Sequence, residues 1–470
     1  EYMGNNLHIM NSEFRGYGAH VLIVPYPAQG HVSPMEQFAK LLVPKGIKVT
    51  IAYNVYLYKT AQICPFSSID VATVSDGYDD KGPKFAKSRE EYFESFKKVG
   101  TLDLTELVAK TNASSHPFTA IIYDSFIPWV RNIARTFNLS AAVFLTQSLA
   151  VNFIYYQIHR GDLPMPLTGE AIAVPGFREF RVCNAPYFVS PIGYGTYPLF
   201  ENMLIKQFEG IEEVDWVLTN IFYELEASLS DWLGKRCRLA TIGPTVPWLY
   251  RDKEAKDCEA YGISLFISDK TTCMSWLDSK PACSVVYVSF GSLAEVGKEQ
   301  MEELAWGLRQ SGLCFLWVVR ETEAEKLPDN YVDDVSGTGL VVSWCPQVEV
   351  LAHESVGCFV THCGFNSVME AICLGVPMVA VPQWTDQPTN AIYIEEVWKI
   401  GIMPKQDETR VVRRDAVADC VKLLIEGERG RELKDNGTKW KELAKKAISA
   451  GGTSDQSICR FVDDLVRLGG

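Results

Sequence analysis

Short apolar runs recur along the first half of the chain, separated by longer stretches of mixed character. The runs lie at residues 20–25, 48–53, 118–123 and 141–145. Uninterrupted runs of this length are typical of strands in a parallel sheet, because such strands are buried on both faces. Helices are expected between them, for example over residues 128–137. The alternation predicts βαβ units, with helices on both faces of a parallel sheet.

The helix expected after the first run carries a start signal in its sequence. Ser33 suits the N-cap, Pro34 suits the first helical position, and Glu36 can complete a capping box three residues after the serine. We therefore expect this helix to begin at Pro34, after the Ser33 N-cap, and to end near Leu42.

The second half of the chain repeats the pattern after a charged stretch, residues 251–270, that has no clear hydrophobic period. Its apolar runs lie at residues 284–290, 314–319, 339–343, 357–361 and 376–381. A helix is expected over residues 298–311. The second half therefore predicts another doubly wound sheet.

A chain of 470 residues is too long for one ordinary domain. We expect one Rossmann-like domain over residues 19–250 and another over residues 271–453, joined by a linker at 251–270. Residues 1–18 are expected to form a mobile N-terminal segment. Residues 454–470 are expected to form a helix that packs back on the first domain.

Polar residues lie directly after several of the predicted strands or in the loops that follow them. His31 and Asp124 follow strands of the first domain, whereas His362 and the pair Asp386 and Gln387 follow strands of the second. Ligands of doubly wound sheets bind outside the carboxyl ends of the strands. The pattern therefore predicts a ligand cleft between the two domains.

Composition narrows the class of protein. The formal net charge of −13 argues against a nucleic-acid partner, which needs a basic face. The 13 cysteines are scattered without a paired spacing, which favours reduced thiols and a cytoplasmic location. No secretory signal is visible, and no apolar run approaches the roughly 20 residues that span a bilayer. We expect a monomer without a membrane span.

Residues 344–387 concentrate the candidate chemistry. Trp344 offers a flat platform for a base. The turn from the strand at 357–361 into the next helix carries His362, Gly364, Asn366 and Ser367. A helix N-terminus at this point suits a pyrophosphate. Asp386 and Gln387 can accept and donate hydrogen bonds to sugar hydroxyls. The layout therefore suits a nucleotide that carries a sugar, although Ser367 and Glu370 are also spaced as a plain capping box.

The same stretch resembles the donor-binding box of the plant family 1 UDP-glycosyltransferases. Further segments resemble that family in the same order, over residues 19–466: PYPAQGHVSPM, SDGYDD, YDSFIPWV, NIFYELE, TIGPTVP, VYVSFGSL and FLWVVR. The resemblance is strongest to the branch that glucosylates phenolics, steroids and terpenoids. It implies the α/β GT-B architecture, in which two facing Rossmann-like domains with mainly parallel sheets bind the acceptor in the N-terminal domain and the UDP-sugar in the C-terminal domain.

The resemblance also implies roles for individual residues. Trp344, Gln347 and Glu370 would hold uracil, nucleoside and ribose. Asp386 and Gln387 would hold the hexose, and glutamine at the second position goes with glucose in the family. Contacts to the rest of the donor, chiefly its diphosphate, are implied for His362, Gly364, Asn366, Ser367, Ser289, Ser292 and Thr146. The family usually has tryptophan where this chain has Phe365, which lacks the indole N–H.

The transfer needs an alcohol made nucleophilic near neutral pH. A histidine is the natural base, and a carboxylate on its other ring nitrogen would fix the tautomer. We expect His31 to be this base, oriented by Asp124, in an inverting O-glucosyl transfer from UDP-glucose. No Asp-x-Asp pair or cluster with metal-ligand spacing occurs in the sequence. The reaction is therefore expected to need no metal and no cofactor besides the donor substrate.

Several alternatives stay open at this point. The expected acceptor is a small lipophilic plant metabolite, and aromatic segments at residues 153–157, 186–189 and 194–200 are candidates for its pocket. The same fold could use another UDP-sugar, form glucose esters on carboxylates, or bind a sugar nucleotide or steroid without catalysis. A nucleotide-dependent oxidoreductase is disfavoured, because the first loop, AQGHVSP, lacks the Gly-x-Gly-x-x-Gly pattern. A membrane-bound relative that transfers glucuronic acid is disfavoured by the absence of a signal and an apolar tail.

Overall fold

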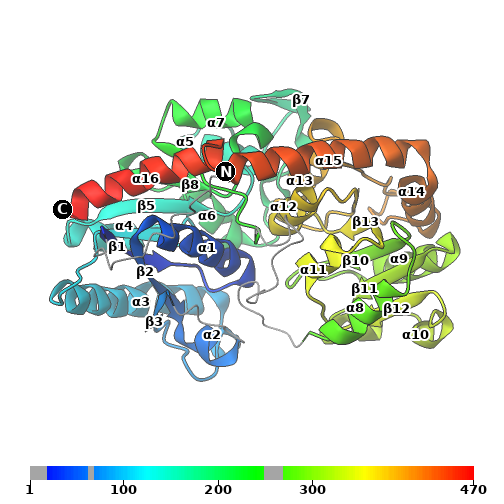
Figure 1. The fold of residues 1–470 in the computed structure, drawn as a ribbon, viewed down its shortest axis with the longest axis horizontal. Coiled ribbons are helices and arrows are strands. Elements are labelled where there is room, and N and C mark those ends of the chain that lie inside the picture. The colour runs from blue at the N-terminus through cyan, green and yellow to red at the C-terminus, as the bar shows by residue number, and fades with distance from the viewer. Residues whose placement is uncertain (1–17, 62–67, 248–267, 470) are drawn as a thin grey trace, which may run out of the picture.

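The computed structural model describes residues 18–61, 68–247 and 268–469 and contains two large parallel sheets (Figure 1). The N-terminal sheet has seven strands in the order β3-β2-β1-β4-β5-β8-β9. These strands are β1 (Ala19–Val24), β2 (Ile47–Asn54), β3 (Asp70–Val74), β4 (Ala120–Asp124), β5 (Ser140–Leu145), β8 (Trp216–Thr219) and β9 (Leu239–Thr241). The four apolar runs of the first half therefore form the centre of this sheet.

The C-terminal sheet has six parallel strands in the order β12-β11-β10-β13-β14-β15. They are β10 (Val285–Ser289), β11 (Cys314–Val318), β12 (Gly339–Val342), β13 (Val356–Thr361), β14 (Met378–Ala380) and β15 (Gly401–Ile402). A small antiparallel pair, β6 (Ala171–Val174) and β7 (Phe177–Arg181), completes the described strands. The prediction of a mixed α/β fold with mainly parallel sheets is confirmed.

The strand order of each sheet reverses at one place. In the N-terminal sheet the reversal lies between β1 and β4, and in the C-terminal sheet it lies between β10 and β13. Loops that leave neighbouring strands at such a point diverge to opposite faces, and the crevice between them is the usual ligand site of the fold. The fold therefore offers two facing positions for ligand groups.

Helices cover both faces of the two sheets (Figure 1). Those of the N-terminal half are α1 (Gln29–Leu42), α2 (Val55–Thr60), α3 (Arg89–Asn112), α4 (Val130–Thr136), α5 (Leu149–Arg160), α6 (Pro198–Lys206) and α7 (Ala227–Gly234). Those of the C-terminal half are α8 (Lys270–Asp278), α9 (Lys298–Ser311), α10 (Tyr331–Asp334), α11 (Gln347–Ala352), α12 (Phe365–Leu374), α13 (Gln387–Ile392), α14 (Arg414–Glu426) and α15 (Glu428–Ile448). The last helix is α16 (Thr453–Gly469).

Alternate residues of each strand face different cores. Val21 and Ile23 of β1 pack in one cluster with α1 and α16, whereas Leu22 and Val24 pack in another with α3, α4 and α5. The second cluster continues into the C-terminal half, where Val368 of α12 belongs to it. The two halves therefore share a buried apolar contact.

The expected start of the first helix is wrong. Helix α1 begins at Gln29, and Pro34 lies inside it rather than at its first position. Proline has no N–H to donate to the carbonyl four residues earlier, which is that of Gly30. That carbonyl instead accepts a hydrogen bond of 2.8 Å from the side chain of Asn366, in the C-terminal half. The interior proline is tolerated because the carbonyl it leaves without a helical partner is bonded across the two halves.

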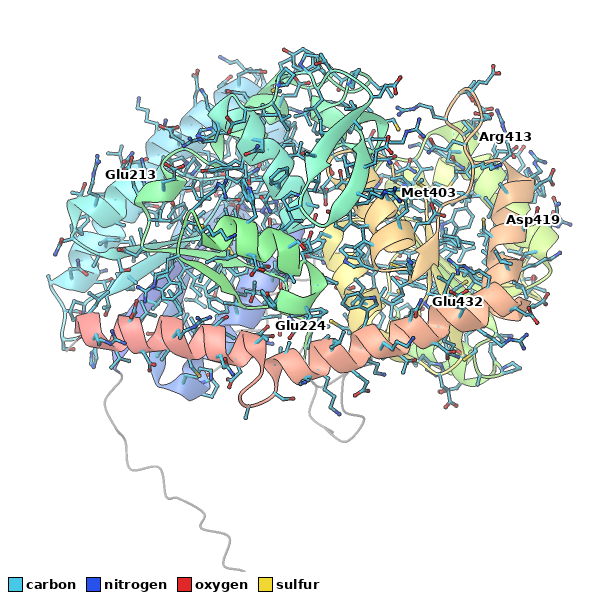
Figure 2. All side chains as sticks on the ribbon, turned by 90° about the horizontal axis from the view of Figure 1, so that it is seen from above. Glu213, Glu224, Met403, Arg413, Asp419 and Glu432 are labelled. Atoms are coloured by element: carbon cyan, nitrogen blue, oxygen red, sulfur yellow. The ribbon has the colours of Figure 1, made fainter. Side chains whose placement is uncertain are left out.

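Helices α15 and α16 run along one side of the molecule, α15 over the C-terminal half and α16 over the N-terminal half (Figures 1 and 2). Figure 2 shows Glu224 beside the joint between them, where its carboxylate accepts a hydrogen bond of 3.0 Å from Thr453. Helix α16 contacts β1 and β9, so the chain returns to the first sheet after completing the second. The expected N-terminal segment, 1–18, and linker, 251–270, lie largely outside the described residues.

Candidate active site

His31 and Asp124 meet at the reversal point of the N-terminal sheet. Asp124 is the last residue of β4, and His31 lies in the first turn of α1, just after β1. The carboxylate oxygen Oδ2 of Asp124 accepts a hydrogen bond of 2.7 Å from His31 Nδ1. Its other oxygen accepts one of 2.9 Å from the backbone N–H of Phe126. A histidine that donates through Nδ1 keeps Nε2 unprotonated and able to accept a proton.

The pair is enclosed but not sealed. The side chain of Asp124 is fully buried, whereas that of His31 is 16% exposed. The rings of Tyr26 and Phe126 lie 5.2 Å and 4.5 Å from the imidazole. The hydroxyl of Thr146, which follows β5, lies 3.3 Å from His31 Nδ1. The imidazole is therefore partly accessible, while the carboxylate bonded to it is shielded from water.

His362 occupies the corresponding place in the C-terminal sheet, directly after β13. Its Nδ1 has no hydrogen-bond partner among the described residues, although the ring is buried. Burial, with a smaller contribution from the nearby Arg320 guanidinium, lowers the pKa of His362 to about 4. The imidazole is therefore neutral at neutral pH and can act as a hydrogen-bond donor without carrying charge.

Two glycines make room for this ring. A Cβ at Gly291 would lie 2.8 Å from the His362 imidazole, and a Cβ at Gly364 would lie 2.4 Å from its Nε2. Gly291 also has a φ of +71°, in the left-handed region that favours glycine. Side chains at these positions would displace the imidazole from the N-terminus of α12.

Ser289 is the last residue of β10, and Ser292 follows Gly291 in the loop after that strand. Ser289 is buried, and its hydroxyl accepts a long hydrogen bond of 3.4 Å from the N–H of Gly291. Arg320 donates to the backbone carbonyls of Ser292 and Ala294. This arginine, which the sequence did not single out, fixes the loop next to His362 by bonding to its carbonyl oxygens.

Gln347, Ser367 and Glu370 form one hydrogen-bonded group. The amide nitrogen of Gln347 donates to Ser367 Oγ at 2.9 Å and to Glu370 Oε2 at 2.7 Å. Its oxygen accepts from the hydroxyl of Tyr287 at 3.0 Å. Trp344, three residues before Gln347, is half-buried and packs against the core. The expected nucleoside and ribose contacts therefore lie together at the start of α11 and α12, with Tyr287 as an added member.

Asp386 and Gln387 lie where α13 begins. The Asp386 carboxylate accepts hydrogen bonds from Thr385 Oγ1 at 2.6 Å and from Asn390 Nδ2 at 2.7 Å. Burial raises the pKa of Asp386 above its ordinary value, and the hydrogen bonds from Thr385 and Asn390 oppose that rise. The side-chain oxygen of Gln387 accepts from the backbone N–H groups of Gln383 and Trp384, at 2.9 and 3.0 Å. The two hydrogen bonds thus fix the Asp386 carboxylate at the start of α13.

The N-terminus of α12 reaches the N-terminal half through Asn366. The side chain that was expected to contact the donor is used, in this structure, in the bond to the Gly30 carbonyl described above. Gly30 immediately precedes His31. The start of the helix that follows His362 is therefore bonded to the turn that carries His31.

The candidate acceptor segments divide into two places. Phe188, Tyr197 and Phe200 form a ring cluster that reaches Trp384, with centroid separations of 5.8 Å from Phe188 and 6.2 Å from Tyr197 to the tryptophan. The cluster continues through Phe93, 6.3 Å from Phe200, and Tyr26, 6.4 Å from Phe93, to His31. Segments 186–189 and 194–200 thus adjoin the candidate site.

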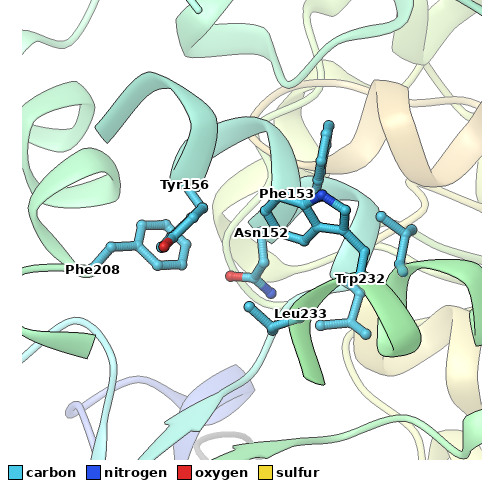
Figure 3. Close-up of a pocket in the computed structure, with 8 residues that line it drawn as sticks. Asn152, Phe153, Tyr156, Phe208, Trp232 and Leu233 are labelled. Atoms are coloured by element: carbon cyan, nitrogen blue, oxygen red, sulfur yellow. The ribbon is translucent and has the colours of Figure 1, made fainter. Parts of the chain in front are cut away.

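The remaining segment, 153–157, lies elsewhere. Phe153 and Tyr156 line a small pocket between α5 and α7, together with Trp232 and Phe208 (Figure 3). None of the candidate site residues lines it. The rings of Phe153 and Trp232 are only 4.7 Å apart and pack edge to face. These aromatic residues belong to the packing of the N-terminal half.

Two absences bear on the site. Among residues 18–61, 68–247 and 268–469, no group of three or more His, Cys, Asp or Glu side chains is arranged to hold a metal ion. Within the same ranges, no helix has the length and apolar character needed to cross a bilayer.

Comparisons with known proteins agree on one family. The family model described as UDP-glucoronosyl and UDP-glucosyl transferase matches residues 269–436. Mogroside I-E synthase of Siraitia grosvenorii is 43% identical over 447 residues, which cover 94% of this chain and 97% of the relative. Flavonol 7-O-beta-glucosyltransferase UGT74F1 of Arabidopsis thaliana is 42% identical over 451 residues, covering 95% and 98%.

Solved structures extend the likeness to three dimensions. Os79 from O. sativa in complex with UDP superimposes with a TM-score of 0.88 at 36% sequence identity, covering 95% of this chain and 100% of that one. The same protein in complex with U2F and trichothecene gives a TM-score of 0.85 at 35% identity, with the same coverage. The two-domain arrangement of this chain is thus that of proteins that bind UDP.

Proposed function

Because the chain belongs to the plant UDP-glycosyltransferase family, with its GT-B fold, we propose that it transfers glucose from UDP-glucose to a hydroxyl group of a lipophilic plant metabolite. The observation that carries the proposal is the 2.7 Å hydrogen bond between His31 and Asp124, in a turn bonded to the N-terminus of α12. One side of the site supplies a base, and the other supplies donors for a diphosphate.

The proposed reaction is a single displacement. His31 Nε2 accepts the hydroxyl proton of the acceptor while its Nδ1–H remains bonded to Asp124, whose charge stabilises the imidazolium. The acceptor oxygen forms a bond to the anomeric carbon as the bond from that carbon to the UDP oxygen breaks. The electron pair leaves with UDP. Attack from the face opposite UDP inverts the configuration and gives a β-glucoside from an α-linked donor.

The departing diphosphate would be stabilised without a metal ion. The first N–H groups of α12 have no partner within the helix and point to its N-terminal end, where the helix dipole favours an anion. Neutral His362 and the hydroxyl of Ser367 add donors at the same end. We expect full activity in EDTA, with no increase when Mg²⁺ or Mn²⁺ is added. A large loss in EDTA, restored by either ion, would contradict this account.

The donor and acceptor assignments rest on different support. Asp386 and Gln387, at the start of α13, are suited to bind hexose hydroxyls, and they support the assignment of glucose as the donor sugar. The acceptor class is supported by the ring cluster from Trp384 to His31 and by the names of the relatives, which include a flavonol 7-O-beta-glucosyltransferase. A flat, largely apolar acceptor with a free hydroxyl fits these aromatic walls.

A donor and acceptor screen tests the proposal. The purified chain is incubated with UDP-glucose, UDP-galactose or UDP-glucuronic acid, and with flavonols, triterpenoids, steroids or simple phenols in turn. Mass spectrometry should detect a hexose adduct with UDP-glucose on at least one class, and the proton coupling at the anomeric carbon should show a β linkage. Transfer of another sugar alone, an α linkage, or binding of UDP without transfer to any acceptor would each contradict the proposal.

A further inference from the structure

Asn390 of α13 lies at the boundary between the two halves, fully buried. Its side-chain nitrogen donates to Asp386 Oδ2 at 2.7 Å and to the backbone carbonyl of Cys363 at 3.0 Å. Its side-chain oxygen accepts from the hydroxyl of Ser148, in the N-terminal half, at 3.0 Å. The amide therefore bonds to the carboxylate proposed to hold the sugar, to the turn after β13, and to the acceptor half of the site.

These three bonds permit one orientation of the amide. An asparagine side chain has two N–H donors and one oxygen acceptor. The Asp386 carboxylate and the Cys363 carbonyl can only accept, so both must face the nitrogen. A flipped amide would place its oxygen against two other oxygens in a buried site, where unpaired polar groups are costly. Asn390 consequently fixes the position of Asp386 Oδ2.

Ser148 extends this arrangement to the base. It is buried and lies two residues after Thr146, whose hydroxyl is 3.3 Å from His31 Nδ1. The short segment from Thr146 to Ser148 therefore touches the imidazole at one end and the amide of Asn390 at the other.

We propose that Asn390 is a positioning residue for sugar transfer: it holds Asp386 toward the hexose and, through Ser148, sets that carboxylate relative to His31. The inference rests on the proposed function for the role of Asp386. Asn390 and Ser148 themselves lie outside the motifs described in the sequence. Transfer requires the anomeric carbon to stand in line with the acceptor oxygen, and small misplacements of reacting groups are costly in rate. The segment from Thr146 to Ser148, bonded at both ends, would hold the sugar-binding carboxylate at a fixed position relative to the base.

The test separates hexose binding from nucleotide binding. Calorimetry gives the affinities of wild type and Asn390→Ala for UDP and for whichever UDP-hexose the wild type binds most tightly, so an incorrect assignment of glucose does not affect the result. Asn390→Ala should weaken UDP-hexose binding about tenfold, since a hydrogen bond to a charged group is lost, while UDP affinity changes less than about twofold. The pH below which UDP-hexose binding is lost should rise. Without the Asn390 donor, ionised Asp386 is less stabilised, so this carboxyl is protonated at a higher pH.

Ser148 variants supply the control and the safeguard against misfolding. Ser148→Ala removes the hydrogen bond from Ser148 to Asn390 and should lower kcat about threefold or more with UDP affinity unchanged. Ser148→Thr keeps a hydroxyl and should restore the rate. Equal loss of UDP and UDP-hexose affinity in Asn390→Ala would indicate a merely structural role and overturn the inference. Unchanged affinities, or equal rates for both Ser148 variants and wild type, would also overturn it. Should Asn390→Ala fail to fold, the Ser148 pair decides alone.

Discussion

The two imidazoles of the site differ in what surrounds them, and this difference separates their proposed roles. His31 is partly exposed and bonded to a buried carboxylate, which favours a ring that gains a proton during the reaction. His362 is buried without a carboxylate on its ring, and its pKa is lowered to about 4. At neutral pH it offers a neutral donor, which avoids the cost of burying a charge when no diphosphate is bound.

The depressed pKa of His362 predicts a pH-dependent contribution to stability. Between pH 4 and the ordinary histidine value of 6.5, the unfolded chain binds a proton at this residue that the folded chain does not. Stability from this group is therefore present above pH 6.5 and is lost as the pH falls toward 4, by about 2 kcal/mol at pH 5. The free energy of unfolding is measured in urea at pH 7 and at pH 5. Its fall from pH 7 to pH 5 should be about 2 kcal/mol larger for wild type than for His362→Asn. An equal fall in both proteins would contradict the assignment.

Chemistry at single positions could be read from the sequence, but pairing between distant positions could not. Asp386 and Gln387 stood out because they follow a predicted strand and match a family motif. Asn390 did not, since an asparagine inside a helix has no signal of its own and its partner Ser148 is 242 residues away. Gln347 was identified, but its bonds to Ser367, Glu370 and Tyr287 were not.

Helix α1 illustrates why an element's boundary can be misread. The Ser33-Pro34 signal is a sound start for an isolated helix, yet the helix begins at Gln29, five residues before Pro34. A proline inside a helix is disfavoured chiefly because it leaves a carbonyl unbonded and crowds it. Here that carbonyl, on Gly30, receives the amide of Asn366 from the other half. Local start signals cannot reveal a bond that forms only when the two halves come together.

The turn from β13 into α12 predicts a steric effect at Gly364. Its φ of −60° and ψ of 135° suit any residue, so alanine there is free of backbone strain but places its Cβ 2.4 Å from His362 Nε2. Gly364→Ala should push the imidazole away from the end of α12 and weaken UDP binding about tenfold or more by calorimetry. Gly234→Ala, at a position with no atom within 4 Å of the added methyl group, is the matched control. Equal UDP affinities for the two variants would refute this account of the turn.

The assembly of the whole molecule depends on contacts between segments far apart in the chain. The parallel sheets followed from the apolar runs, but their order did not, because pairs such as Val21 with Ala120 join residues about a hundred positions apart. Helix α16 returns to the first sheet, where the ring of Phe461 packs 6.2 Å from that of Phe38 and 5.6 Å from that of Trp216. We therefore expect α16 to stabilise the N-terminal half without taking part in the chemistry of the site.

Truncating Phe461 should separate these two contributions. The side chain is fully buried, so Phe461→Ala should cost about 3–5 kcal/mol of unfolding free energy. Transfer activity at low temperature, measured per folded molecule, should stay near wild type. Leu468→Ala on the same helix, at a side chain that is 61% exposed, should change stability by less than about 0.5 kcal/mol. Similar unfolding free energies for the two variants would contradict the proposed packing of α16.

The most direct test of the central claim, that His31 is the base, is a comparison of glucosyl transfer and UDP binding in wild type and His31→Ala. In His31→Ala, kcat should fall by about 10²- to 10⁴-fold, with UDP affinity unchanged within about twofold because most of the proposed UDP contacts lie in the C-terminal half. Asp124→Asn should also lose rate, since it no longer holds the ring as a charged acceptor. Transfer at the wild-type rate by His31→Ala would contradict the account.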